Sequence, residues 1–114
     1  MPVLLSTAEM NDLAEKLAKM RFNRAKGYAR GLDKHSRLEL FRTVVDPNTL
    51  VTRYALPTKG LRISLIERKE PRGALSKLGY QRMRFRYVEA RVEALPDYAY
   101  HENIGNPGVQ IENL

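Results

Sequence analysis

The sequence predicts an α+β domain in which one long N-terminal helix packs on an antiparallel meander of about four strands, followed by an extended C-terminal tail. Three observations lead to this prediction: a helical apolar stripe near the N-terminus, strand-like segments joined by short turns, and a long alternating segment before residue 95. The 114 residues are enough for one domain with its own core. We therefore expect a single domain over residues 1–95 and an acidic tail over residues 96–114.

The N-terminal helix is expected to begin after Ser6, whose hydroxyl can cap the first turn while Glu9 bonds back to the cap residue. Apolar side chains then recur at helical spacing, at Met10, Leu13, Leu17 and Met20. Gly27 and Gly31 predict that the helix ends between residues 25 and 31.

The middle of the chain is typical of β-structure. Residues 38–45 and 50–56 are rich in β-branched, leucine and aromatic residues, and they flank a turn that starts at Asp46. A second turn at residues 56–60 precedes a third strand, in which Leu61, Ile63 and Leu65 alternate. Loops this short predict antiparallel pairing, because parallel strands require long crossovers.

The last predicted strand follows a loop over residues 70–79 and separates two kinds of side chain. Period-2 alternation places Arg82, Arg84 and Arg86 on one face and Met83, Phe85 and Tyr87 on the other, where we expect core packing. The apolar positions change phase after Tyr87 and continue at Val88, Ala90, Val92 and Ala94, which predicts a β-bulge at residues 87–88.

Positive charge is concentrated in the predicted domain. The chain carries a formal charge of +7, which divides into +10 on residues 1–94 and −3 on residues 95–114. A basic surface of this kind favours a polyanionic partner, either nucleic acid or an acidic protein surface.

Three groups of basic residues are candidates for phosphate contacts. On the helix, Lys16, Lys19, Lys26 and Arg30 recur at 3-4 spacing, with Arg21 and Arg24 on their flank; Arg82, Arg84 and Arg86 follow one strand face, and Arg72 and Lys77 lie in the preceding loop. The structural alternatives are a solvated helix face and, for the strand arginines, cross-strand pairing with Glu39 or Glu67.

These features predict a small non-enzymatic nucleic-acid-binding protein that contacts backbone phosphates, with limited sequence readout and a steep dependence on salt. One alternative is a structural or adaptor subunit of a larger assembly that docks an acidic protein partner through the same surface. The sequence is compatible with a homo-oligomer in either case. Another is a small metal-independent ribonuclease-like protein, in which His35 would stand beside Lys34 and Arg37. No catalytic residues are assigned.

Several classes of function lack the residues that they need. The chain has no cysteine and only two histidines, at positions 35 and 101, so we expect no metal site and no cofactor. The N-terminus lacks a basic region followed by a long apolar run, and no segment approaches the ~20 apolar residues that span a bilayer. We therefore expect an intracellular, cytoplasmic protein without a membrane partner.

Overall fold

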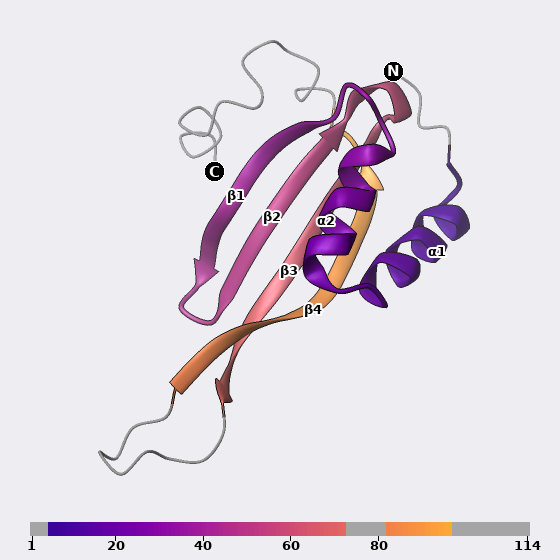
Figure 1. The fold of residues 1–114 in the computed structure, drawn as a ribbon. Helices are drawn as coiled ribbons and strands as arrows, with labels where there is room; N and C mark the ends of the chain where they lie inside the picture. Colours follow the sequence, from indigo (N-terminus) through magenta and orange to yellow (C-terminus); the bar gives the residue numbers. More distant parts are fainter. Residues whose placement is uncertain (1–4, 73–81, 97–114) are drawn as a thin grey trace.

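The computed structural model describes residues 5–72 and 82–96, which form two helices and a four-stranded antiparallel sheet (Figure 1). The strands lie in the order β1-β2-β3-β4, so the predicted α+β class and the antiparallel meander are confirmed. The predicted tail and most of the predicted loop lie outside the described residues. In chain order the elements are α1 (Thr7–Ala18), α2 (Phe22–Gly31), β1 (Arg37–Asp46), β2 (Thr49–Leu56), the 3-10 turn η1 (Pro57–Lys59), β3 (Leu61–Arg72) and β4 (Arg82–Ala94).

The prediction of one long helix is wrong, because the chain forms two short helices. Helix α1 begins with the expected capping box between Ser6 and Glu9, and it ends at Lys19. Arg21 has an extended backbone, and α2 starts directly after it. No glycine or proline marks this break. It allows α1 to lie beside β4 while α2 crosses β2 and β3, so tertiary packing overrides the local helical pattern (Figure 1).

The two turns of the meander form as their residues require. The Asp46 carboxylate accepts hydrogen bonds from the backbone N–H of Asn48 and from the hydroxyl of Thr49, at 2.7 and 3.0 Å, which closes the β1–β2 turn. Gly60 ends η1 with a φ of 63°, a conformation that glycine adopts without steric cost. The predicted hairpin turn and the second turn are therefore both present.

The phase change in β4 produces the predicted bulge. Tyr87 lies opposite Glu67 and Glu89 lies opposite Ile66, so Val88 is the extra residue between them. As a result, Tyr87 lies on the same side of the sheet as Ala90, although the two are three positions apart and regular alternation would place them on opposite sides.

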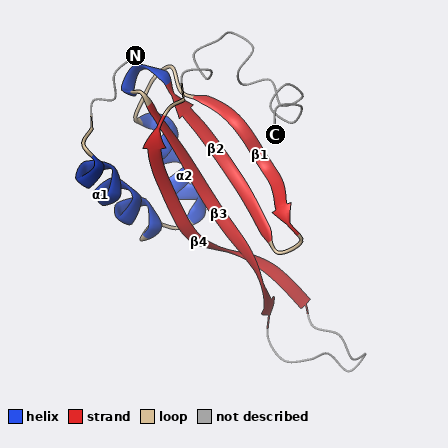
Figure 2. Ribbon diagram, turned by 180° about the vertical axis from the view of Figure 1, so that it is seen from behind, coloured by secondary structure: helices blue, strands red, loops and turns tan. Residues whose placement is uncertain are grey.

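Both helices cover one face of the sheet, and Figure 2 shows that no helix of the described residues lies on the opposite face; we call it the helix-free face. The core lies between the helices and the sheet and is centred on Leu17, Ala25, Ala29, Tyr54, Leu56, Leu61, Ile63, Leu65 and Ala90. Tyr87 joins it by donating a 2.9 Å hydrogen bond to the carbonyl of Leu17 and by an edge contact with the ring of Phe22. Burial raises the pKa of Tyr87 to about 12.

The expectation that β4 aromatics would be core is only partly correct. Tyr87 packs under the helices, whereas Phe85 is 36% exposed. The reason is the length of the β3–β4 hairpin, which extends past the ends of β1, β2 and both helices (Figure 1). The side chain of Met83 lies outside the description.

Strand β1 is irregular at Arg42, which has a φ of 58° within a bulge of the β1–β2 pairing. The guanidinium of Arg42 lies 4.8 Å from the ring centroid of Phe22 and forms an ion pair with Glu67. Burial raises the pKa of Glu67, although the charges of Arg42 and Lys26 act in the opposite direction. Glu67 therefore pairs on the helix-covered side and is not a partner for the strand arginines.

Candidate nucleic-acid interface

The helical part of the predicted site forms a continuous cationic segment. Residues 16–32 include six basic residues and no acidic residue. Five of the six are exposed, Lys16 among them, and the other four exposed residues form no ion pair with an acid in the part of the chain that the structure describes. We call this set the basic helix surface: Lys19, Arg21, Arg24 and Arg30.

The predicted stripe Lys16–Lys19–Lys26–Arg30 does not share one face, because the break before α2 resets the helical phase. Lys16 donates a 2.8 Å hydrogen bond to the Tyr28 hydroxyl and lies over the Tyr28 ring, which joins α1 to α2. Lys26 lies 4.8 Å from the ring centroid of Phe41 on β1. Both lysines therefore have intramolecular roles, while Arg21 and Arg24, expected only as flanking residues, take their place.

The start of α2 differs from the start of α1. Its N-cap residue, Arg21, provides no capping side chain, and its first turn contains no acidic residue. Helix N-termini carry partial positive charge and unpaired N–H groups, so cations there reduce stability by roughly 0.3–1 kcal/mol each. An anion bound beside Arg21 and Arg24 would relieve this repulsion.

The outer side of α2 is smooth between Arg24 and Arg30. Gly27 and Gly31 are exposed there, and a Cβ atom added to either glycine would meet no other atom within 4 Å. A phosphate backbone could therefore approach the helix closely between the two arginines.

Gly27→Ala is expected to increase the free energy of unfolding by about 0.5–1 kcal/mol, because alanine reduces the entropy lost when the helix forms. Urea denaturation followed by circular dichroism measures this change. Gly60→Ala provides the contrast and should be destabilising, since its φ is positive. A loss of stability in Gly27→Ala would show that the outer side of α2 is not open.

The predicted strand arginines lie on a different surface. Tyr87 points toward the helices, so the alternation of the strand places Arg86 on the helix-free face. Arg86 is exposed and lies 3.6 Å from the carboxylate of Glu70. This supports the alternative of cross-strand pairing, with Glu70 as the partner. The sheet separates Arg86 from the basic helix surface, so the two do not form one interface.

For three of the remaining predicted residues, Arg72, Arg82 and Arg84, the structure describes only the backbone. The register pairs Arg84 with Glu70 and Arg82 with Arg72, near the far end of the β3–β4 hairpin. Their side chains are outside the description, and Lys77 lies outside the described residues.

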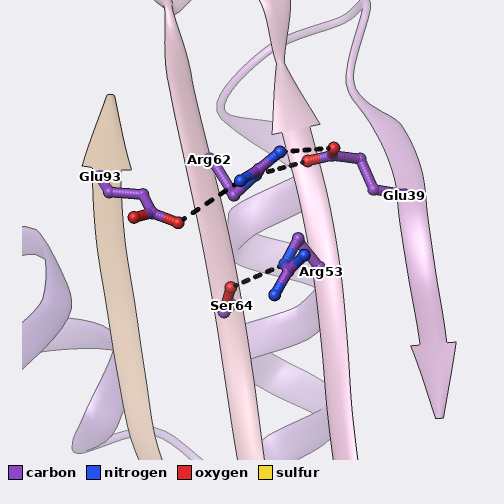
Figure 3. Close-up of polar contacts among 5 residues, drawn as sticks. All are labelled: Glu39, Arg53, Arg62, Ser64 and Glu93. Atoms are coloured by element: carbon purple, nitrogen blue, oxygen red, sulfur yellow. Dashed lines mark hydrogen bonds and ion pairs between the residues drawn. The ribbon is translucent and has the colours of Figure 1, made fainter. Parts of the chain in front are cut away.

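A further basic group on the helix-free face was missed by the sequence analysis. Arg53 on β2, Arg68 on β3 and Arg91 on β4 line a hollow of about 310 Å³. Only the strand pairing brings these arginines together, and no spacing along the chain could have revealed it. The Arg53 guanidinium donates a 3.3 Å hydrogen bond to the hydroxyl of Ser64 on the adjacent strand (Figure 3).

Arg62, also on the helix-free face, forms ion pairs with two glutamates. Figure 3 shows Arg62 reaching toward Glu39 on one side and Glu93 on the other. Both oxygens of Glu39 accept hydrogen bonds from the guanidinium at 3.0 Å, and the Glu39 side chain is completely buried. Glu39, suggested from the sequence as a partner for the β4 arginines, pairs instead with Arg62.

Within residues 5–72 and 82–96, no group of three or more histidine or acidic side chains could hold a metal ion. Neither described helix has the length and apolar character needed to cross a membrane. Comparisons with protein-family models, curated proteins and solved structures find no match, so the functional argument depends on the residues themselves.

Proposed function

We propose that this protein binds nucleic acid without catalysis, through phosphate contacts made by the basic helix surface. The observation that carries the proposal is the run of six basic residues without an acid over residues 16–32, five of them exposed and without an acidic partner among the described side chains. Lysine and arginine side chains that neutralise phosphates release condensed counterions, which provides affinity with little dependence on sequence.

The contrast with the helix-free face supports this choice of surface. There, two exposed arginines of β4 have acidic neighbours: the Nε of Arg91 donates to Glu89 at 2.9 Å, and Arg86 lies 3.6 Å from Glu70. A nucleic-acid phosphate at Arg86 or at the Nε of Arg91 would compete with a carboxylate already in place. Arg21, Arg24 and Arg30 have no such competitor among the described residues, and the uncapped start of α2 adds two further reasons for an anion to bind: a favourable dipole and unpaired N–H groups.

The test is the salt dependence of binding to fluorescent single-stranded RNA, single-stranded DNA and duplex DNA. For the protein with an unchanged sequence, log Kd against log salt should rise with a slope of several units. In the triple variant Arg21→Gln/Arg24→Gln/Arg30→Gln, the slope should fall by about 2–3, since each lost phosphate contact removes roughly 0.7–0.9.

A matched triple variant, Arg68→Gln/Arg86→Gln/Arg91→Gln, removes the same charge from the helix-free face and should keep most of the slope. Equal losses in both triple variants would mean that only net charge matters. Absence of binding to all three nucleic acids at low salt would overturn the proposal and leave an acidic protein as the partner of this surface.

A further inference from the structure

The hollow on the helix-free face is built from three adjacent strands in register. Arg53 on β2 lies opposite Ser64 on β3, and Ser64 lies opposite Arg91 on β4, so two arginines flank one serine across the sheet. Adjacent strands are about 4.8 Å apart, which places the two arginine backbones about 10 Å from each other. Both side chains line the same hollow of about 310 Å³ as Ser64.

The polar groups of this row have donors available for an anion. The Nε of Arg53 donates to the Ser64 oxygen, so the serine hydroxyl proton is available to another acceptor (Figure 3). Arg91 uses its Nε for Glu89, and its terminal nitrogens lie on a side chain that is 65% exposed. Arg53 forms no ion pair with an acid among the described residues. Two arginine side chains and a serine thus line the hollow with donors available to an anion.

The two acidic residues that line the hollow, Asp46 and Glu93, have partners elsewhere in the protein. The two oxygens of Asp46 accept from Asn48 and Thr49 in the β1–β2 turn, and Glu93 lies 3.8 Å from Arg62. Neither acid forms an ion pair with Arg53 or Arg91 among the described residues.

The floor of the hollow is apolar. Val51 and Ile66 lie opposite each other on β2 and β3 and are both nearly buried. Beyond them stands Arg68, four residues along β3 from Ser64, or about 13 Å at 3.3 Å per residue. The hollow thus combines an anion-binding end, an apolar floor and a third arginine that can stack on a planar ring.

We propose that this hollow binds an organic phosphate with a flat body, for which a nucleoside monophosphate is the representative. The phosphate lies above Ser64 between Arg53 and Arg91, because a guanidinium fork pairs well with phosphate oxygens and a tetrahedral dianion accepts from three directions. The flat body lies on Val51 and Ile66, next to Arg68. A volume of about 310 Å³ falls at the lower end of the size range of small-molecule sites.

This site lies on the opposite side of the sheet from the basic helix surface, so it is independent of the proposed function. The experiment titrates the ¹⁵N-labelled protein with adenosine 5′-monophosphate, adenosine and inorganic phosphate, and follows the backbone amide signals. The monophosphate should give saturable shifts centred on Arg53, Ser64 and Arg91. Adenosine and inorganic phosphate should each bind at least about tenfold more weakly, since each lacks one half of the recognised ligand.

Two variants test the assignment of the phosphate position. Arg53→Gln should weaken binding of the monophosphate about tenfold, and Ser64→Ala should weaken it several-fold. Lys59→Gln, an exposed cation on η1 that belongs to neither basic surface, is the control and should leave the monophosphate affinity unchanged. The proposal is wrong if the monophosphate gives no saturable shifts, if the shifts centre on α2, or if Arg53→Gln binds it as tightly as the unchanged protein. Inorganic phosphate binding as tightly as the monophosphate would overturn the role of the apolar floor.

Discussion

Replacing Glu39 with alanine is expected to lower the free energy of unfolding by about 3 kcal/mol. Glu39 is completely buried and accepts two hydrogen bonds from Arg62, whose side chain is 8% exposed. Removing one member of a buried ion pair leaves an uncompensated charge, which costs roughly 3–5 kcal/mol. We expect the lower value because Arg62 keeps its 3.8 Å contact with the more exposed Glu93.

Urea denaturation of three variants distinguishes two causes of a lower free energy of unfolding: an uncompensated buried charge and the loss of side-chain packing. Glu39→Ala should show the full loss, whereas the double variant Glu39→Met/Arg62→Met should recover most of it, because similar-sized apolar side chains remove both charges. Arg91→Gln breaks an exposed pair with Glu89 and should cost less than about 1 kcal/mol. A double variant less stable than Glu39→Ala would show that the pair itself stabilises the sheet.

Asp33→Ala is expected to cost about 2–3 kcal/mol, through the loss of a link between two loops. The buried carboxylate of Asp33 accepts hydrogen bonds from the backbone N–H of His35 and of Thr58, both at 2.8 Å. These bonds connect the segment after α2 to η1, and their removal leaves two donors without their acceptor. Thermal denaturation should show the loss, while Asp12→Ala, an exposed site on α1, should change stability by less than about 0.5 kcal/mol.

The same carboxylate makes stability depend on pH in acid. Burial opposes ionisation of Asp33, but the hydrogen bonds from Thr58 and His35 prevail and hold its pKa below the usual value. A depressed pKa in the folded state adds stability that is complete above the unfolded-state pKa, about 3.9, and is lost as the pH falls through the folded-state value. Asp33→Asn should therefore flatten the decline in stability below about pH 4. An unchanged acid profile would mean that other carboxylates control it.

The parts of the fold that depend on local patterns could be predicted. The turn at Asp46 follows from a short polar side chain that bonds to its own backbone, and the bulge at Val88 follows from a phase change in the alternation. The break at Lys19–Arg21 could not be predicted, because no residue there disfavours a helix and the break arises from packing against two different parts of the sheet.

The two candidate sites also differ in how far the sequence alone could predict them. The basic helix surface was partly visible in the sequence, since the absence of acids over residues 16–32 does not depend on how the helices pack. Which cations contact an aromatic ring of the protein itself could not be predicted, because it depends on where Tyr28 and Phe41 meet Lys16 and Lys26. The row Arg53–Ser64–Arg91 requires the register of three strands, which the turn between β2 and β3 and the bulge in the β3–β4 pairing determine together.

The irregular β1 also affects how the sheet could meet another chain. An open sheet has two outer strands whose unpaired N–H and C=O groups can template an incoming strand, which is a common route to aggregation. The β1–β2 pairing has three register shifts, one of them at Arg42, so a straight strand added to β1 would lose hydrogen-bond alignment after a few residues. The bulges that position Arg42 over Phe22 thereby also protect this outer strand against intermolecular β-pairing.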